Sequence, residues 1–309
     1  MNNKCVIYLG NGYDVAWGFK TKYCQFIEST IFKELKSTCN LAKWVDDKYS
    51  EDKNRWSDLE EMLFIYSNYL RNLYKDSHEF RNATDMFKEE HRRLTITLQK
   101  YIAEQLHSSS GSVYMRKLED SWKSSFEIKC ICCFNYSANA VYSKLIDGYN
   151  KLNRIHGELQ PRGNYTEVQV KLGIDRSMKV CPEHGFLYKD KMPTYSYGIW
   201  SEPNKRLIAA GKIVKPAVTT FHPEFHDVDS IIIYGCSIGE SDTAYFKYLF
   251  DNAKGKKIIL YYYMDAEKVK IMKRIREISK YPVEDILFID SAKDGGFRKD
   301  FSTLIKRGV

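Results

Sequence analysis

The chain has 309 residues, of which 43% are apolar and 28% charged, a composition that argues against a disordered protein. It contains no run of eighteen uncharged apolar residues and no N-terminal secretion signal, so we expect a cytoplasmic protein that does not span a membrane. The formal net charge of +8 is modest for this length and does not by itself indicate a nucleic-acid partner.

Short apolar runs alternate with long amphipathic stretches along the chain. This alternation favours an α/β fold over a β-sandwich or a helical bundle. We therefore predict a Rossmann-like parallel sheet flanked by helices. The expected strands cover residues 4–9, 128–134, 153–156, 230–235, 256–263 and 284–290.

The residues between the first two expected strands contain no convincing strand and have helical periodicity. Ser57 and Glu60 form a capping box at the start of one amphipathic helix, and a second long helix is expected at about 79–107. The expected division places residues 27–125 in a helical insertion and residues 1–26 and 126–309 in the nucleotide-binding sheet domain.

The motif around the capping box allows two interpretations. Trp56 and the box most simply anchor the insertion on the sheet. Alternatively, Asp58 and Glu60 reach the nucleotide site as ligands for ribose or water. Their distance from Asn135 would decide between the two.

Positive charge gathers late in the chain, where nine Lys or Arg stand against three Asp or Glu between Lys254 and Lys280. Ile271, Met272, Ile275 and Ile278 recur there at helical spacing, which predicts a surface helix packed on the sheet. A solvated face is favoured over a nucleic-acid footprint. Residues 261–263 are all tyrosines, but they fall in an expected strand, where packing is favoured over base stacking.

The eight cysteines are expected to be reduced, because five of them lie in apolar runs that resemble strands. Cys181 and His184 have the spacing of half a zinc site, but no second ligand pair accompanies them. We therefore expect no metal.

Small and polar residues follow four of the expected strands directly. In an open parallel sheet, ligands bind beyond the carboxyl ends of the strands. Glycines let the backbone approach a pyrophosphate, while hydroxyl and carboxylate groups hold ribose hydroxyls. The set therefore predicts a dinucleotide site, over which residues 160–203 would form a lid. Its members are Gly10, Asn11, Gly12, Asp14, Asn135, Tyr136, Ser137, His156, Gly157, Gly235, Ser237 and Asp242.

No single member of this set is specific. Val15 stands where a dinucleotide fingerprint has its third glycine. A strand followed by two glycines, as at Gly10 and Gly12, is about as often a plain tight turn as a phosphate-binding loop. A lone histidine such as His156 is more often structural than catalytic. The prediction depends on the arrangement as a whole.

Five short motifs resemble those of the phage abortive-infection proteins called AbiH, and they occur in order along nearly the whole chain. Ser137 stands where the family usually has threonine, and Cys236 where it usually has histidine, so we expect no catalytic task at position 236. The motifs are Leu9-Gly-Asn-Gly-Tyr-Asp14, Trp56-Ser-Asp-Leu-Glu60, Phe134-Asn-Tyr-Ser137, Ile155-His-Gly157 and Gly235-Cys-Ser-Ile-Gly-Glu-Ser-Asp242.

The same motifs are similar, more distantly, to the sirtuin-like domains of antiviral proteins that hydrolyse NAD. This resemblance implies that Asn135 holds the nicotinamide ribose and positions the attacking water, and that His156 is the general base. Ser137 replaces an aspartate of the sirtuin pattern. Cleavage through an oxocarbenium-like state requires a rigid site, a placed water and one base, so neither a metal nor a covalent nucleophile is needed.

Three functions remain open at this point. The first is an antiphage effector that binds NAD and hydrolyses it. The second is a sensor that binds the nucleotide without turnover, and the third is a toxin directed at nucleic acid. A phage-derived trigger and a second copy of the chain are partners we keep open.

Overall fold

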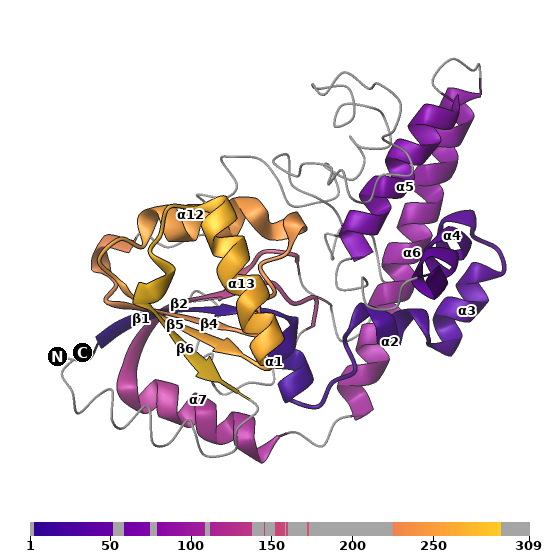
Figure 1. Ribbon diagram of the computed structural model, residues 1–309. Coiled ribbons are helices and arrows are strands. Elements are labelled where there is room, and N and C mark those ends of the chain that lie inside the picture. The colour runs from indigo at the N-terminus through magenta and orange to yellow at the C-terminus, as the bar shows by residue number, and fades with distance from the viewer. Residues whose placement is uncertain are drawn as a thin grey trace.

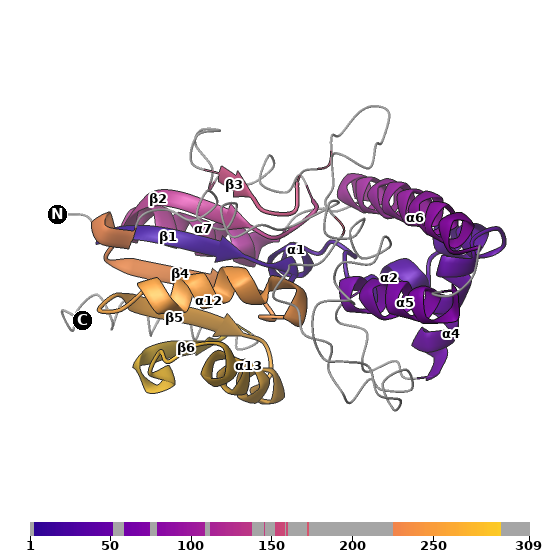
Figure 2. The ribbon, with the colours of Figure 1, turned by 90° about the horizontal axis from the view of Figure 1, so that it is seen from above.

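The computed structural model describes residues 3–51, 59–74, 79–108, 112–137, 145, 152–157, 159, 172 and 225–291. Within these residues, six strands form one all-parallel sheet in the order β3-β2-β1-β4-β5-β6 (Figure 2). The predicted α/β class and all six expected strands are confirmed. The strands are β1 (Asn3–Leu9), β2 (Phe126–Cys133), β3 (Leu152–Arg154), β4 (Ser230–Tyr234), β5 (Lys257–Tyr262) and β6 (Ile286–Asp290).

Helices cover both faces of the sheet, so successive residues of the central strands are buried on opposite sides. On one face, Ile7 and Ile232 pack with α7 (Val113–Ser125), whose Trp122 is fully buried. On the other face, the strands pack against α12 (Thr243–Asn252) and α13 (Asp265–Ile278) (Figure 1). Burial on both faces explains why these strands are continuous apolar runs.

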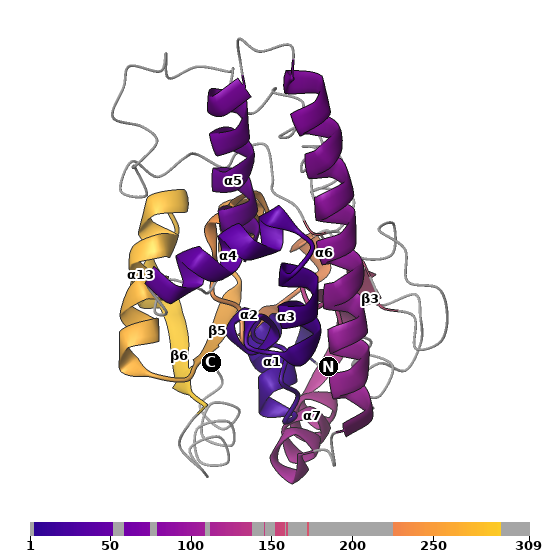
Figure 3. The same ribbon diagram turned by 90° about the vertical axis from the view of Figure 1, so that its right-hand side faces the viewer.

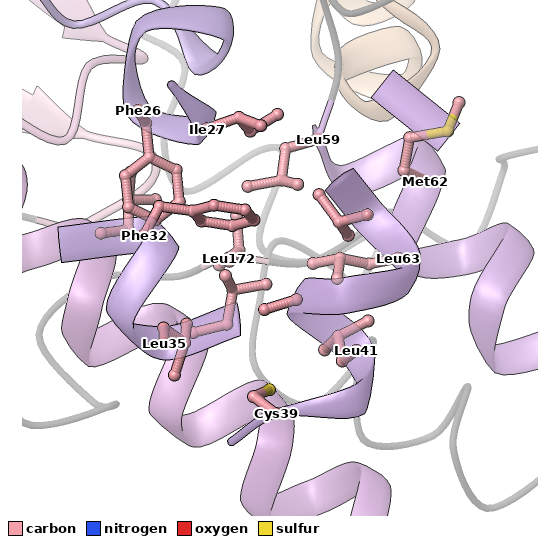
Figure 4. Packing of buried hydrophobic residues seen from close by; sticks show 14 of the residues in the cluster. Phe26, Ile27, Phe32, Leu35, Cys39, Leu41, Leu59, Met62, Leu63 and Leu172 are labelled. Atoms are coloured by element: carbon pink, nitrogen blue, oxygen red, sulfur yellow. The ribbon is translucent and has the colours of Figure 1, made fainter. Parts of the chain in front are cut away.

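A helical body lies beyond the carboxyl ends of the strands, as Figures 2 and 3 show. It has a hydrophobic core of its own, in which Phe26, Phe32, Leu41 and Leu63 pack together (Figure 4). A helical N-terminal region is therefore present, as predicted. Its helices are α2 (Tyr23–Ile27), α3 (Thr30–Lys36), α4 (Asn40–Glu51), α5 (Leu59–Tyr74) and α6 (Phe80–Ser108).

The last helix before β2 belongs to the core of the sheet. The expected insertion of residues 27–125 includes α7, whose Met115, Leu118 and Trp122 recur at helical spacing and pack on the sheet. The helical body described above is therefore made from α2 to α6. The division into two domains stays a prediction.

The late surface helix is present as predicted. Ile271, Ile275 and Ile278 of α13 are buried on the sheet. Tyr262 is also buried, whereas Tyr263 follows the end of β5 and is 62% exposed, so packing is confirmed as the main use of the tyrosine run.

Several sequence predictions lie outside the described residues. These are Trp56, Ser57 and Asp58, the Cys181 and His184 pair, and the expected lid at 160–203 apart from Leu172. Among the described residues, no helix is long and apolar enough to cross a membrane. Seven cysteines in the described part of the chain are free thiols, and all but Cys24 are buried.

Candidate functional site

The candidate site lies where the sheet reverses its winding. The strand order runs outward from β1 to β3 on one side and from β4 to β6 on the other, so the connections diverge between β1 and β4. Such a switch point, beyond the carboxyl ends of the strands, is where open α/β sheets bind ligands. Helix α1 (Asn11–Ala16) starts here, and the turn after β4 lies beside it.

Two glycine turns meet at this point through their backbones. The N–H of Gly10 donates to the carbonyl of Tyr234, and the N–H of Gly12 donates to the carbonyl of Gly235, each at 2.9 Å. A Cβ added to Gly10 would lie 2.4 Å from the Gly235 oxygen, and one added to Gly235 would lie 2.4 Å from the Tyr13 nitrogen. Glycine is required at these positions because one backbone fills the space of the other's side chain.

This packing gives the glycines a role that involves no ligand. The sequence pattern was interpreted as an approach path for a pyrophosphate, and contact of Gly10, Gly12 and Gly235 with a dinucleotide stays a prediction. Gly235 also has a φ of 66°, in the left-handed region that favours glycine.

Asp14 and Asn135 form a buried polar pair at the ends of β1 and β2. The amide Nδ2 of Asn135 donates to Oδ1 of Asp14 at 2.9 Å. Because a carboxylate only accepts, the amide nitrogen must face Asp14 and the amide oxygen must face away. That oxygen and the hydroxyl of Ser137 are buried, and neither has a hydrogen-bond partner among the described residues. Buried polar atoms are as a rule paired in folded proteins, with other protein groups, with water or with a ligand.

His156 and Asp242 form a second pair, between the residues after β3 and those after β4. The ring Nε2 lies 3.1 Å from Oδ1 of Asp242, and the His156 residue is only 4% exposed. The Phe134 ring meets the imidazole edge to face, with centroids 5.4 Å apart. Because Asp242 accepts, Nε2 carries a proton, which leaves the lone pair of a neutral ring on Nδ1. The geometry suits a general base.

Glu60 joins the site from the helical body. Its Oε1 accepts a hydrogen bond of 2.7 Å from the hydroxyl of Tyr136, the residue between Asn135 and Ser137. The Tyr136 ring in turn lies against His156, with centroids 5.4 Å apart. Glu60 therefore contacts the neighbour of Asn135, which leaves both interpretations of the acidic motif open: anchoring by Trp56 and the capping box, and binding of ribose or water, stay predictions. The short Trp56–Glu60 motif is the only sequence signal that points to Glu60. Nothing in the residues around Glu60 indicates that Tyr136 is its partner.

The other residues of the predicted set lie at the margin of this cluster. Asn11 is exposed and its side chain binds Thr21, donating to the carbonyl at 3.1 Å and accepting from the hydroxyl at 2.6 Å. Ser237 is exposed, and Gly157 has a φ of 81°. Burial raises the pKa of the Cys236 thiol well above its usual value, and the nearby Asp242 raises it further, which favours the protonated, less reactive thiol.

A hollow of about 310 Å³ lies elsewhere, at the amino end of the sheet, and contains none of the predicted site residues. It is lined by Phe225, His226, Tyr248, Asn252 and Lys256. We place the site at the carboxyl edge instead, because the buried polar pairs and the switch point coincide there. Within the residues that the structure describes, no cluster of three His, Cys, Asp or Glu side chains is arranged to hold a metal.

Comparison with known families supports the resemblance seen in the motifs. A family model described as Bacteriophage abortive infection AbiH matches residues 6–264, which include every candidate site residue. Searches of curated proteins and of solved structures found no match. Because the family model covers well over half of the sequence, this chain belongs to the bacteriophage abortive infection AbiH family.

Proposed function

We propose that this AbiH protein is an antiphage effector that binds NAD at the carboxyl edge of its sheet and hydrolyses the bond between nicotinamide and ribose. One observation carries the proposal. A His156–Asp242 pair and an Asn135–Asp14 pair converge at the switch point, beside two buried oxygens that have no hydrogen-bond partner within the described part of the chain. The distant similarity of the motifs to sirtuin-like domains supports NAD as the ligand.

The residues suit a hydrolysis that needs no metal. As the bond from ribose to the positively charged nicotinamide breaks, the ribose becomes oxocarbenium-like and nicotinamide leaves as a neutral molecule. Asn135 Oδ1 accepts a hydrogen bond from the attacking water or from a ribose hydroxyl. His156 Nδ1 takes the proton of the water, and Asp242 stabilises the resulting imidazolium. The products are ADP-ribose, nicotinamide and one proton.

Ser137 differs from the sirtuin pattern, which has an aspartate at this position. A buried hydroxyl can donate to a ribose oxygen as well as accept, but it brings no charge to the site. We therefore assign Ser137 to ribose binding and leave the electrostatic task to Asp14 and Asp242.

Nucleic acid is the less favoured substrate because three of the five basic side chains of helix α13 have partners close by. Arg274 and Lys273 lie 3.2 Å and 3.9 Å from Glu277 carboxylate oxygens. Lys268 stands over the rings of Tyr262 and Phe288, at 5.4 Å and 5.2 Å from their centroids. This pattern is typical of a solvated face.

The test is to incubate the purified protein with NAD and to quantify nicotinamide and ADP-ribose. His156→Ala should lower turnover by about 10² to 10⁴ while the protein stays folded. His226→Ala is the matched control, since His226 is exposed at the opposite edge of the sheet.

A wild type that leaves NAD intact, both alone and in cells infected with phage, would end the hydrolysis proposal. Binding of NAD would then be tested by measuring whether NAD raises the melting temperature of the protein. A ligand at a hundred times its dissociation constant adds about 2.7 kcal/mol, so a raised melting temperature without turnover would identify a sensor. A phage-derived trigger and self-association stay predictions.

A further inference from the structure

Glu60 is a charged residue of the helical body that lies buried against the sheet domain. It is the second residue of α5 and is only 2% exposed. A carboxylate at the first turn of a helix interacts favourably with the helix dipole and can do so in water. Burial makes the same group costly unless it is bonded, so its contact with Tyr136 is a specific requirement of this arrangement.

Tyr136 connects Glu60 to the groups that the proposed reaction uses. Its ring lies against His156 at an interplanar angle of 38°, and its backbone joins Asn135 to Ser137. Burial raises the pKa of the Tyr136 phenol well above its usual value, and the charge of Glu60 adds to this, so the phenol keeps its proton and donates it. Tyr23 of α2 donates to the same hydroxyl at 3.3 Å, which fixes the phenol from a second side.

We propose that Glu60 is a positioning residue of the strand-end site. By holding the hydroxyl of Tyr136, it sets the ring against which His156 rests and the backbone that presents Asn135. The helical body thereby completes the site instead of only standing beside it. Helix α5 also contacts the turn Glu240–Asp242, which carries the partner of His156, so both polar pairs are in reach of one helix. This inference rests on the proposed function.

The protein offers a matched control for a purely structural role. Glu119 of α7 is also 2% exposed, and it accepts a hydrogen bond from the hydroxyl of Tyr13. The two pairs share their chemistry and their burial. The Glu119 pair lies in the core on the α7 face of the sheet. Tyr13 precedes Asp14 in the chain, but no described contact joins Glu119 or the Tyr13 ring to His156 or Asn135, so the comparison tests the contact of the Tyr136 ring with His156.

The experiment compares Glu60→Ala, Glu60→Gln and Tyr136→Phe with Glu119→Ala. For each variant, kcat and KM for NAD are measured, together with the melting temperature and protection of cells against phage. A displacement of the catalytic groups by about 1 Å costs about 10²-fold, so Glu60→Ala should lower kcat by about that factor with little change in KM. Glu60→Gln should recover most of the activity, because its amide oxygen still accepts from Tyr136.

Glu119→Ala should lower the melting temperature as much as Glu60→Ala does, while kcat of the folded protein persists. Tyr136→Phe removes only the hydroxyl that Glu60 binds. It therefore tests the same hydrogen bond if the Glu60→Ala protein does not fold. Its kcat should fall, and combining it with Glu60→Gln should add little, since both changes act on one hydrogen bond. Equal loss of kcat in the Glu60 and Glu119 variants, or an unchanged kcat in Tyr136→Phe, would overturn the inference.

Failure of the proposed function gives a different result. A wild type that protects cells but never consumes NAD overturns the hydrolysis proposal, and phage protection then decides the role of Glu60. Loss of protection in folded Glu60→Ala, with protection kept in Glu119→Ala, supports positioning of the same site for another reaction. Equal protection by both variants overturns it.

Discussion

The contact between the two glycine turns predicts an unusually large effect for Gly235→Ala. An alanine Cβ at this position would stand 2.4 Å from the nitrogen of Tyr13 and 2.6 Å from the backbone of Gly12. Ordinary van der Waals contact begins near 3.4 Å, so the turns must separate by about 1 Å. Backbone atoms cannot rotate away as the end of a long side chain can.

The cost has two parts that can be separated. Holding alanine at a left-handed φ costs about 1–2 kcal/mol. Separation of the turns also strains or breaks the hydrogen bonds from Gly10 and Gly12, each worth about 0.5–1.5 kcal/mol. We expect Gly235→Ala to lower the free energy of unfolding by about 2–5 kcal/mol in all.

Gly255→Ala is the matched control. Gly255 has a similar φ of 76°, but a Cβ there would meet nothing within 4 Å. It should therefore show only the conformational cost of about 1–2 kcal/mol. Urea unfolding followed by far-UV circular dichroism measures both variants. Equal destabilisation by the two would refute the view that the turns require glycine for their mutual approach.

Two further predictions concern the electrostatics of the site. The pKa of Tyr136 is raised above its usual value of 10.0, so above that pH the unfolded chain releases a proton that the folded protein keeps, and stability should fall as pH rises. Tyr136→Phe should make this fall shallower by up to about 1.4 kcal/mol per pH unit in unfolding measured from pH 9 to 11.5, and an identical slope would contradict it. Asn135→Asp would place a second carboxylate where the amide now lies 2.9 Å from Asp14, so the two groups would have to share a proton. Folding would then raise the pKa of the shared carboxyl, so we expect a loss of about 2–4 kcal/mol at pH 7 that shrinks as pH falls from about 7 to about 4, where the unfolded chain binds the proton as well. A deficit independent of pH would argue against a charged Asp14.

The sheet could be predicted from sequence because its strands are buried on both faces. Runs such as Ile231-Ile232-Ile233 are apolar at every position, which is typical of a parallel strand covered by helices on both faces. The ends agree within about two residues, as expected for boundaries set by hydrogen bonding instead of side-chain type. The place of helix α7 in the sheet core does not follow from the sequence, because periodicity shows that a helix has a buried face but not which element covers it.

The site residues were only partly predictable for a similar reason. The position of His156 and Asn135 directly after strands follows from the parallel sheet, so the sequence could bring them to one edge. Asp14 and Asp242 belong to the same set of strand-end residues, but which side chains pair with which could not be found in this way. Glu60 reaches Tyr136 across 76 residues, and a glycine pair looks the same in sequence whether a ligand or another backbone fills the missing side-chain space.

The meeting of the two turns also bears on when the site can exist during synthesis. Gly12 emerges from the ribosome long before Gly235, and at about 5–20 residues per second the interval is about 10–45 s. Until β4 is made, β1 lacks one neighbour in the sheet, Gly10 lacks the carbonyl that its N–H binds, and His156 lacks Asp242. A nascent or interrupted chain therefore carries Asn135 and His156 without the turn that supplies Asp242, and the activity we propose would be withheld until most of the protein has been translated.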